Sequence, residues 1–343
     1  MKKRYWVTGA CGLVGMAWAA KMLRRPKDVH WNEHAHDLHH SNHSRFAEIQ
    51  GARVHYQEAG AASAPSLLLI HGFTASNFVW KDVLLPIAEA GFRVIAPDLL
   101  GFGFSDKPKE AQYTIGAQSQ LIVGLMDELR IQKATLVGSS YGGAIAATCA
   151  LDYPRRVERL VLVDAVINDH VKRRPLLRLA ASPLLGDLIS PLMLGSRRLV
   201  HQQMRRGYAF ENRHLFDEDR MTAHHRPLLA ANTQRATLTT LRRWDAGRID
   251  EEAHRIEQPT LLIWGEVDPE TPLAHGRRLL EQIPDARLVI FPRCGHMPME
   301  EYPQGFAEVL TEFCSPEATS NDEQWQVDER VWSIVDSLTH NVS

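Results

Sequence analysis

The sequence predicts an α/β protein, in which a helical insertion interrupts a mostly parallel, doubly wound sheet. Short apolar runs of strand type alternate with helical runs over residues 45–165 and again over 251–314, a pattern typical of parallel sheets covered on both faces. Residues 166–250 hold no run of strand type, so this segment contributes no strand to the predicted sheet. With 343 residues, of which 44% are hydrophobic and 23% charged, the chain is long enough for this architecture.

The N-terminal segment, residues 1–26, has the pattern of a hydrophobic anchor or signal sequence. After a basic start, residues 5–20 carry no charge, and aromatic side chains lie near both ends, as they often do at a membrane surface. This run is shorter than the roughly 20 residues of a spanning helix, although Lys21 can snorkel and extend it. We predict membrane association through residues 5–23. Export after cleavage near residues 17–19, or a cytoplasmic location, are the alternatives.

A histidine-rich segment, residues 27–44, follows. Four of its histidines would crowd one side of a helix, which would suit metal capture, but no surrounding groups that would fix such ligands are apparent. We therefore interpret it as a polar linker and predict no metal site. Its histidines are His30, His34, His36, His39, His40 and His43.

One stretch of the N-terminal segment, residues 7–15, is similar to the glycine-rich turn of short-chain dehydrogenases. Too few residues precede it for a buried strand, and no second strand that ends in an acid follows it. We predict no bound cofactor.

The first part of the core, residues 45–165, begins with two alternating runs that predict an antiparallel hairpin around Gly51. Continuous apolar runs then predict buried parallel strands. The expected hairpin strands are 46–49 and 54–58, the expected parallel strands 66–70, 92–96, 134–137 and 160–164, and the expected helices 115–129 and 143–150.

The segment between the strand at 134–137 and the helix that follows it, residues 138–142, fits the G-x-S-x-G pattern of a nucleophile elbow. In such a turn a strand passes sharply into a helix and lifts a serine hydroxyl clear of the sheet. Gly138 and Gly142 stand where a Cβ would collide with the neighbouring strand and helix. The pattern therefore predicts Ser140 as a nucleophile.

The insertion, residues 166–250, has prolines at 175, 183, 191 and 227 and helical spacing in pieces. Residues 166–255 hold 16 Lys and Arg against 10 Asp and Glu, whereas the rest of the chain is acidic. Such asymmetry could attract an anionic substrate or a membrane surface, but basic residues on solvated helix faces are the more common reason for it.

The second part of the core, residues 251–314, resumes the parallel pattern. We expect strands at 260–264 and 287–291 and helices at 274–282 and 303–313. The C-terminal tail, residues 315–343, is polar up to a short amphipathic helix predicted at 325–338.

Three side chains of complementary chemistry follow strand ends in the order serine, acid, histidine: Ser140, Asp268 and His296. A serine hydroxyl needs a base to take its proton, and that base needs an acid that holds the correct tautomer. The carboxyl ends of parallel strands meet at one edge of the sheet, so these groups can come together. Asp164 also ends a strand and is the rival acid.

Five successive landmarks across residues 46–314 resemble those of the α/β-hydrolase superfamily: residues 71–73, the loop 98–106, the elbow, residues 265–272, and Gly295-His296 with Glu300. The resemblance implies that Ser140 is the nucleophile, His296 the general base and then acid, and Asp268 the orienting carboxylate. It also implies that the insertion is a lid or cap, and that the backbone N–H groups of Phe73 and Tyr141 form the oxyanion hole.

Two further residues are candidates for the substrate pocket: His71 and Met297. We expect His71 to shape the oxyanion loop by hydrogen bonding rather than to transfer protons. Met297 follows the candidate base directly and could line the pocket or belong to the core.

The predicted function is hydrolysis of a carboxylic ester, small or lipid-derived, through an acyl-enzyme. Epoxide hydrolases and haloalkane dehalogenases of the superfamily use Asp at the elbow, whereas Ser140 indicates attack on a carbonyl. Cleavage of a C–C bond in a ring-cleavage product, and a non-catalytic ligand-binding protein of the same fold, are the alternatives. The net charge of −2 gives no reason to expect nucleic acid, and the four scattered cysteines predict no disulfide framework. The sequence leaves the oligomeric state open.

Overall fold

The computed structural model describes residues 31–35, 38–168 and 175–315. The predicted anchor at residues 5–23 and the predicted tail helix at 325–338 lie outside these residues. Within the described ranges, no helix combines the length and the apolar character that crossing a membrane requires.

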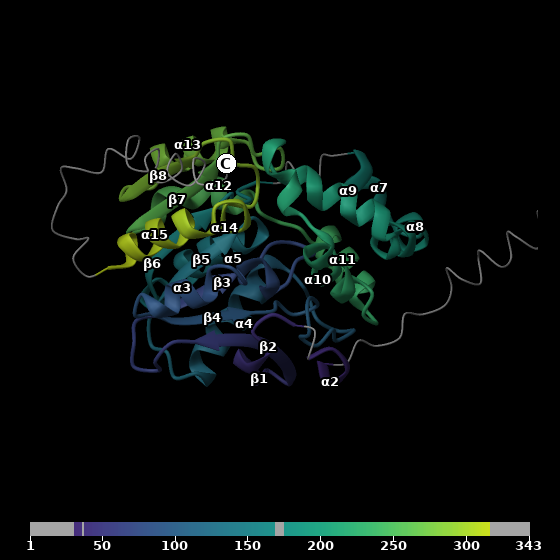
Figure 1. Cartoon of the computed structure of the whole chain (residues 1–343), viewed down its shortest axis with the longest axis horizontal. Coiled ribbons are helices and arrows are strands. Elements are labelled where there is room, and N and C mark those ends of the chain that lie inside the picture. The colour runs from purple at the N-terminus through teal and green to yellow at the C-terminus, as the bar shows by residue number, and fades with distance from the viewer. Residues whose placement is uncertain (1–30, 36–37, 169–174, 316–343) are drawn as a thin grey trace, which may run out of the picture.

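The core is a single eight-stranded sheet in the order β1-β2-β4-β3-β5-β6-β7-β8, as Figure 1 shows. Strands β3 to β8 are mutually parallel, and β1 and β2 extend the sheet antiparallel beyond β4. The predicted fold class is therefore confirmed. The strands are β1 (Ser44–Ile49), β2 (Ala52–Ala59), β3 (Ser66–Ile70), β4 (Arg93–Pro97), β5 (Ala134–Ser139), β6 (Val157–Val163), β7 (Thr260–Gly265) and β8 (Ala286–Phe291).

Helices cover both faces of this sheet because successive side chains of a strand point to opposite sides. In β5, for example, Leu136 packs in the cluster that contains helices α4 (Ile115–Glu128) and α5 (Tyr141–Asp152). Its neighbour Val137 packs in the opposite cluster, with α3 (Leu84–Glu89) and α15 (Pro303–Cys314). When both faces of a strand are buried, its residues form a continuous apolar run in the sequence. This is why the strand could be predicted from the sequence.

Between β6 and β7 the chain forms the insertion, whose helices α7 to α11 lie to one side of the sheet, whereas α12 lies close to α5 (Figure 1). No strand occurs in its described residues, in agreement with the sequence. Side-chain caps begin two of the helices: Ser196 accepts the N–H of Leu199, and Asp217 that of Arg220. The helices are α7 (Pro175–Ala181), α8 (Leu185–Gly195), α9 (Arg197–Gly207), α10 (Glu218–Leu228), α11 (Thr233–Arg242) and α12 (Gly247–Glu252).

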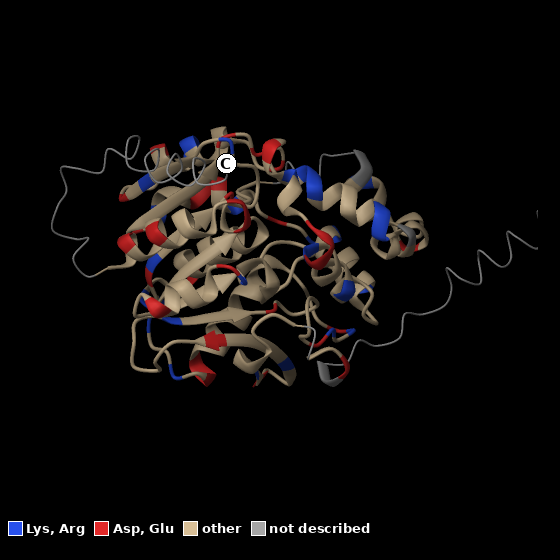
Figure 2. Ribbon diagram, viewed as in Figure 1, with Lys and Arg blue, Asp and Glu red and all other residues tan. Residues whose placement is uncertain are grey.

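Basic residues lie at both ends of helix α9 (Figure 2). Arg197 and Arg198 begin the helix, Arg205 and Arg206 end it, and all four are exposed. Solvated faces of this kind account for part of the charge asymmetry along the chain.

The described part of the histidine-rich segment packs against the core. His40 Nε2 lies 2.8 Å from the carbonyl of Lys81, and His43 Nδ1 lies 2.9 Å from that of Glu58. The amide of Gln57 donates to the carbonyl of His39 at 2.7 Å. Among the described residues, none of these histidines belongs to a group with the spacing of metal ligands.

Candidate active site

The candidate nucleophile Ser140 lies in the turn between β5 and α5, with φ 54° and ψ −116°. This conformation is rare for a residue with a side chain, and the surrounding backbone holds it there. The N–H of Ser140 donates to the carbonyl of Val163 at 2.9 Å, and its carbonyl accepts the N–H of Val166 at 2.9 Å. The elbow is thus fixed by the neighbouring strand β6 and the residues that follow it.

The two glycines of the elbow are sterically required. A Cβ on Gly138 would lie 2.2 Å from the carbonyl oxygen of Gly142, and a Cβ on Gly142 would lie 2.2 Å from that of Ile70. No atom pair tolerates such an approach, so the backbone would have to shift. This agrees with the reason inferred from the sequence pattern.

The candidate acid and base follow β7 and β8. Asp268 Oδ2 lies 2.8 Å from His296 Nδ1. This contact keeps the ring proton on Nδ1 and makes Nε2 the basic nitrogen. The His296 side chain is 12% exposed and that of Asp268 is fully buried, so the pair is shielded from solvent but reachable at the ring.

Asp268 is held as a carboxylate by several donors. Its Oδ1 accepts the N–H groups of Glu270 at 2.6 Å and Thr271 at 3.2 Å, and the Thr271 hydroxyl reaches Oδ2 at 2.6 Å. Burial by itself would raise the pKa of Asp268, but the His296 ring and these hydrogen bonds outweigh it and hold the pKa below its ordinary value. The group is therefore ionised at neutral pH.

The candidate oxyanion donors flank the elbow. Tyr141 is the first residue of α5, a position whose N–H has no partner within the helix, and Phe73 lies in the loop after β3. That loop touches the nucleophile, because a Cβ on Gly72 would lie 3.2 Å from the Cβ of Ser140. Among the described residues, neither N–H has a protein acceptor.

His71 is fully buried, and both of its ring nitrogens bond to backbone. Nε2 accepts the N–H of Leu99 at 3.0 Å, so Nδ1 carries the proton and donates it to the carbonyl of Gly72 at 2.8 Å. Burial lowers the pKa of His71, which keeps the ring neutral. This arrangement fits the loop-shaping role expected from the sequence and leaves no ring nitrogen for a substrate.

A family model described as the alpha/beta hydrolase fold matches residues 65–303, which is more than half of the chain. The chain belongs to the α/β-hydrolase family. The resemblance noted from the sequence landmarks is thus confirmed, and the chain is a hydrolase with a small-molecule substrate.

Several known proteins resemble this hydrolase over most of their length. It is 31% identical over 275 residues to the 2-hydroxymuconate semialdehyde hydrolase of Pseudomonas sp. (strain CF600), a match that covers 77% of this chain and 90% of that protein. The structure of the meta-cleavage product hydrolase CumD from Pseudomonas fluorescens IP01 matches with a TM-score of 0.66 at 26% identity, covering 81% and 98% of the two chains. A bacterial membrane phospholipase A matches with a TM-score of 0.66 at 25% identity, covering 91% and 98%.

Three aromatic rings of the hydrolase pack together beside the elbow. Trp244, from the segment after α11, has its ring centroid 4.8 Å from that of Tyr141 and 5.4 Å from that of Phe73. Phe73 is partly exposed, whereas the other two rings are buried. Sequence reasoning missed Trp244, because an isolated tryptophan in a helical insertion carries no positional signal.

The loop of His296 is bonded directly to the end of helix α9. The N–H of His296 donates to the carbonyl of Gly207 at 2.6 Å, and Gly295 leaves no room there for a Cβ, which would lie 2.1 Å from the same oxygen. Glu301 joins the two segments, since it accepts the N–H groups of Gly295 at 2.9 Å and Ala209 at 3.0 Å. The insertion therefore lies against the candidate base.

A buried ion network reinforces this junction. Glu300 is completely buried and lies 3.0 Å from Arg220 and 3.3 Å from His224, both on α10. The Tyr208 hydroxyl also donates to it. Arg220 continues to Asp82 on the core at 2.6 Å. Met297, the second pocket candidate, is partly buried between the core and the apolar cluster of the insertion.

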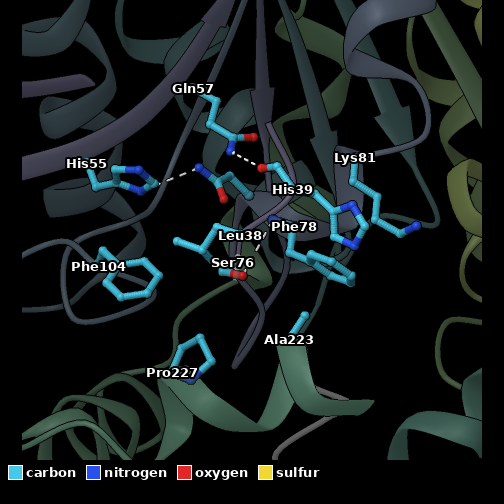
Figure 3. Close-up of a pocket in the computed structure, with 11 residues that line it drawn as sticks. Leu38, His39, His55, Gln57, Ser76, Phe78, Lys81, Phe104, Ala223 and Pro227 are labelled. Carbon is cyan, nitrogen blue, oxygen red and sulfur yellow. Dashed lines mark hydrogen bonds between the residues drawn. The ribbon is translucent and has the colours of Figure 1, made fainter. Parts of the chain in front are cut away.

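A small cavity lies apart from these groups, between the histidine-rich segment, β2 and α10 (Figure 3). Its volume of about 20 Å³ is room for roughly one ordered water. It is too small for an ester substrate, and no residue of the candidate triad lines it. The lining residues are Leu38, His39, His55, Gln57, Ser76, Asn77, Phe78, Lys81, Phe104, Ala223 and Pro227.

Proposed function

We propose that this hydrolase cleaves a carboxylic ester through an acyl-enzyme, with Ser140 as the nucleophile. The observation that carries the proposal is the 2.8 Å contact between His296 and Asp268, formed from two strand ends, at the edge of the sheet where the elbow presents Ser140. No metal or cofactor is needed for this chemistry.

In the first half of the reaction, the Ser140 hydroxyl oxygen attacks the ester carbonyl carbon while His296 Nε2 takes the hydroxyl proton. Asp268 stabilises the resulting imidazolium. The negative charge that develops on the carbonyl oxygen is stabilised by the N–H groups of Phe73 and Tyr141. The imidazolium then returns the proton to the departing alkoxide, which leaves as an alcohol.

In the second half, a water molecule attacks the carbonyl carbon of the acyl-enzyme, and His296 Nε2 takes a proton from it. Collapse of the tetrahedral intermediate breaks the bond to Ser140, whose oxygen recovers its proton from the imidazolium. The carboxylic acid is released, and the enzyme returns to its starting state.

The apolar surroundings of the elbow support an ester with an apolar acyl group. The rings of Phe73, Tyr141 and Trp244 pack against one another beside the elbow, only Phe73 is partly exposed, and apolar walls with few polar groups are usual for such pockets. We propose that the helices of the insertion, residues 166–250, form the cap that limits the size of the substrate. A lipid-derived ester fits the same site.

Labelling with a fluorophosphonate tests the nucleophile. We expect the probe to modify Ser140 in the folded protein, and Ser140→Ala to abolish both the label and ester turnover. The adjacent buried Ser139 is the matched control: Ser139→Ala is expected to keep the label. Ester turnover by Ser140→Ala at the wild-type rate would contradict the proposal, and labelling without turnover of any substrate would favour the ligand-binding alternative.

A second candidate function is the hydrolysis of a C–C bond in a ring-cleavage product. It is favoured by the 31% identity to a 2-hydroxymuconate semialdehyde hydrolase. Parallel assays with p-nitrophenyl esters of increasing acyl length, monoacylglycerols and a vinylogous diketone separate the two functions. A kcat/KM for the diketone far above that for every ester would replace the ester assignment.

A further inference from the structure

Asp164 lies next to the candidate triad but is not part of it. It follows β6 directly and is completely buried, with a left-handed φ of 43° that Asp adopts more readily than most residues. Its own N–H donates to the carbonyl of Ile263 at 2.9 Å, and its carbonyl accepts the hydroxyl of Thr271 at 2.9 Å. The backbone thus fixes where this side chain lies.

The two oxygens of the Asp164 carboxyl group differ in their hydrogen bonds. Oδ1 accepts the N–H of Gly265 at 2.9 Å. Oδ2 is buried without a hydrogen-bond partner among the described residues. An ionised carboxylate in this position would have one donor for two charged oxygens, and burying charge without donors is strongly unfavourable.

The carboxyl groups of Asp164 and Asp268 are close neighbours. Ligand atoms of these two residues and of His296 all lie within 4.8 Å of one another. Two buried carboxyl groups this close do not both ionise, so one of them keeps its proton. Asp268 has the donors and the imidazole, and therefore Asp164 is the group that remains protonated.

The other groups around Asp164 act in the same direction. Burial first, and then the charge of Asp268, raise the pKa of Asp164 well above its ordinary value, with a smaller contribution from Glu301. The thiol of Cys294 also faces this region, and burial together with the surrounding carboxyl groups raises its pKa. Apart from the imidazole of His296, no cationic group among these neighbours favours an ionised Asp164.

We propose that Asp164 is a neutral carboxylic acid whose Oδ2–H donates to the carboxylate of Asp268 and so positions that carboxylate against His296. The inference rests on the proposed function, because it extends the triad by one residue. Asp164 does not touch the substrate and its proton is not transferred, so it is a positioning residue.

The hydrogen-bonding capacity of Thr271 supports this arrangement. Its hydroxyl has one hydrogen, yet it lies 2.9 Å from the carbonyl of Asp164 and 2.6 Å from Oδ2 of Asp268. When Thr271 donates to the carbonyl, Oδ2 of Asp268 loses the hydroxyl as a donor and keeps the ring N–H of His296. A protonated Asp164 then supplies a second side-chain donor to the Asp268 carboxylate.

Asp164→Asn tests the charge of the side chain. The amide can still accept from Gly265 and donate toward Asp268, so we expect kcat/KM to stay within roughly five-fold of wild type. We also expect the pH midpoint at which kcat/KM falls on the acid side to move by less than about 0.3 unit. An ionised Asp164 would instead stabilise a protonated base, so its neutralisation would lower that midpoint by about one unit, which would overturn the proposal.

Asp164→Ala tests the donor. We expect kcat/KM to fall roughly 10-fold to 100-fold, because a hydrogen bond to a charged group is lost. The acid-side midpoint should rise by about half a unit to one unit. Without the donor, the carboxylate of Asp268 stabilises protonated His296 more strongly and raises the pKa of the base. A merely structural role would lower stability but leave this midpoint unchanged in the folded protein, and that result would overturn the proposal.

Infrared spectroscopy reads the proton without any turnover, and it decides the case if Asp164→Ala does not fold. The wild-type minus Asp164→Asn difference spectrum at pH 7 should contain the carbonyl band of a protonated carboxylic acid. The control is Asp98, a buried aspartate whose carboxylate accepts the N–H groups of Asn77 and Phe104, each at 2.8 Å. The wild-type minus Asp98→Asn difference spectrum should contain no such band.

These measurements separate the inference from the proposed function. If the fluorophosphonate failed to label wild-type Ser140, the proposed function would fail, while the infrared spectrum would still report the protonation of Asp164. If labelling and ester turnover were normal but the Asp164 carboxyl band were absent at pH 7, the inference alone would be wrong.

Discussion

At the scale of single residues, the site depends on two glycines that have no Cβ atom as well as on the side chains that react. Ser140 keeps its strained backbone because Gly138 and Gly142 let strand, turn and helix approach one another to distances that no Cβ would permit. This requirement is local in sequence. It explains why a five-residue pattern was enough to identify the elbow.

A glycine substitution measures this requirement directly. We expect Gly142→Ala to lower the free energy of unfolding by at least about 3 kcal/mol and ester turnover by at least roughly 100-fold, because the new Cβ would lie 2.2 Å from the carbonyl oxygen of Ile70. Gly116 in α4 is the control, since a Cβ at this position would point into open space, with no packed neighbour within 4 Å. Gly116→Ala should be neutral or stabilise the protein by up to about 1 kcal/mol. Chemical denaturation and ester assays of both variants check this, and equal behaviour of the two would contradict it.

At the scale of elements, the junction between the insertion and the core decides the environment of the candidate base. Gly207, at the end of α9, accepts the N–H of His296, while α10 is fastened to the core through Glu300 and Asp82. A movement of these helices would therefore displace His296. The sequence predicted helices here, but nothing in their spacing revealed which strand end they would touch.

Glu300→Gln tests this junction. The change leaves Arg220 buried with one carboxylate fewer, and we expect the free energy of unfolding at pH 7 to fall by roughly 3 kcal/mol. Limited proteolysis should then cut the insertion faster. The control is the exposed pair of Arg197 and Glu218, which Arg197→Gln removes at an expected cost of less than about 1 kcal/mol.

The same junction should depend on pH. Burial by itself would raise the pKa of Glu300, but His224, Arg220 and Tyr208 outweigh it and hold the pKa below its ordinary value. The carboxylate therefore stabilises the fold above the ordinary Glu value of about 4.3, and this contribution is lost as the pH falls through the lowered value. The stability difference between wild type and Glu300→Gln should shrink below about pH 4. A difference that stayed constant down to the acid transition would contradict the network.

At the scale of the whole molecule, the chain combines the α/β-hydrolase core with an N-terminal segment that has the sequence pattern of an anchor. The described part of the histidine-rich segment is already bonded to β2 and to Lys81, so the core begins before its first strand. The segment that precedes it carries the predicted anchor. Cutting the chain at residue 30 removes the predicted anchor and keeps every residue that the structure describes.

Removal of residues 1–30 tests the predicted membrane association. We expect the full chain to sediment with the membrane fraction and the shortened chain to stay in the supernatant, because the uncharged run at residues 5–20 is gone. For a short p-nitrophenyl ester, kcat/KM should stay within about two-fold, since the site is intact. Identical fractionation of the two proteins would rule out an anchor in this segment.

The sequence by itself determined the architecture and the three candidate residues of the triad. Buried parallel strands have continuous apolar runs, and the elbow needs glycines at fixed positions. Both features can therefore be recognised from short stretches of sequence. The glycine turn at residues 265–268, which resembles a landmark of the superfamily, also placed Asp268 ahead of its rival Asp164, although both follow strands.

Only the tertiary structure decided how these groups meet. It brought Asp268 within 2.8 Å of His296, left Asp164 buried behind the pair, and set Trp244 and the end of α9 against the site. These contacts join residues far apart in the chain. They depend on how loops and helices pack over a shared edge of the sheet, and no single stretch of sequence contains that information.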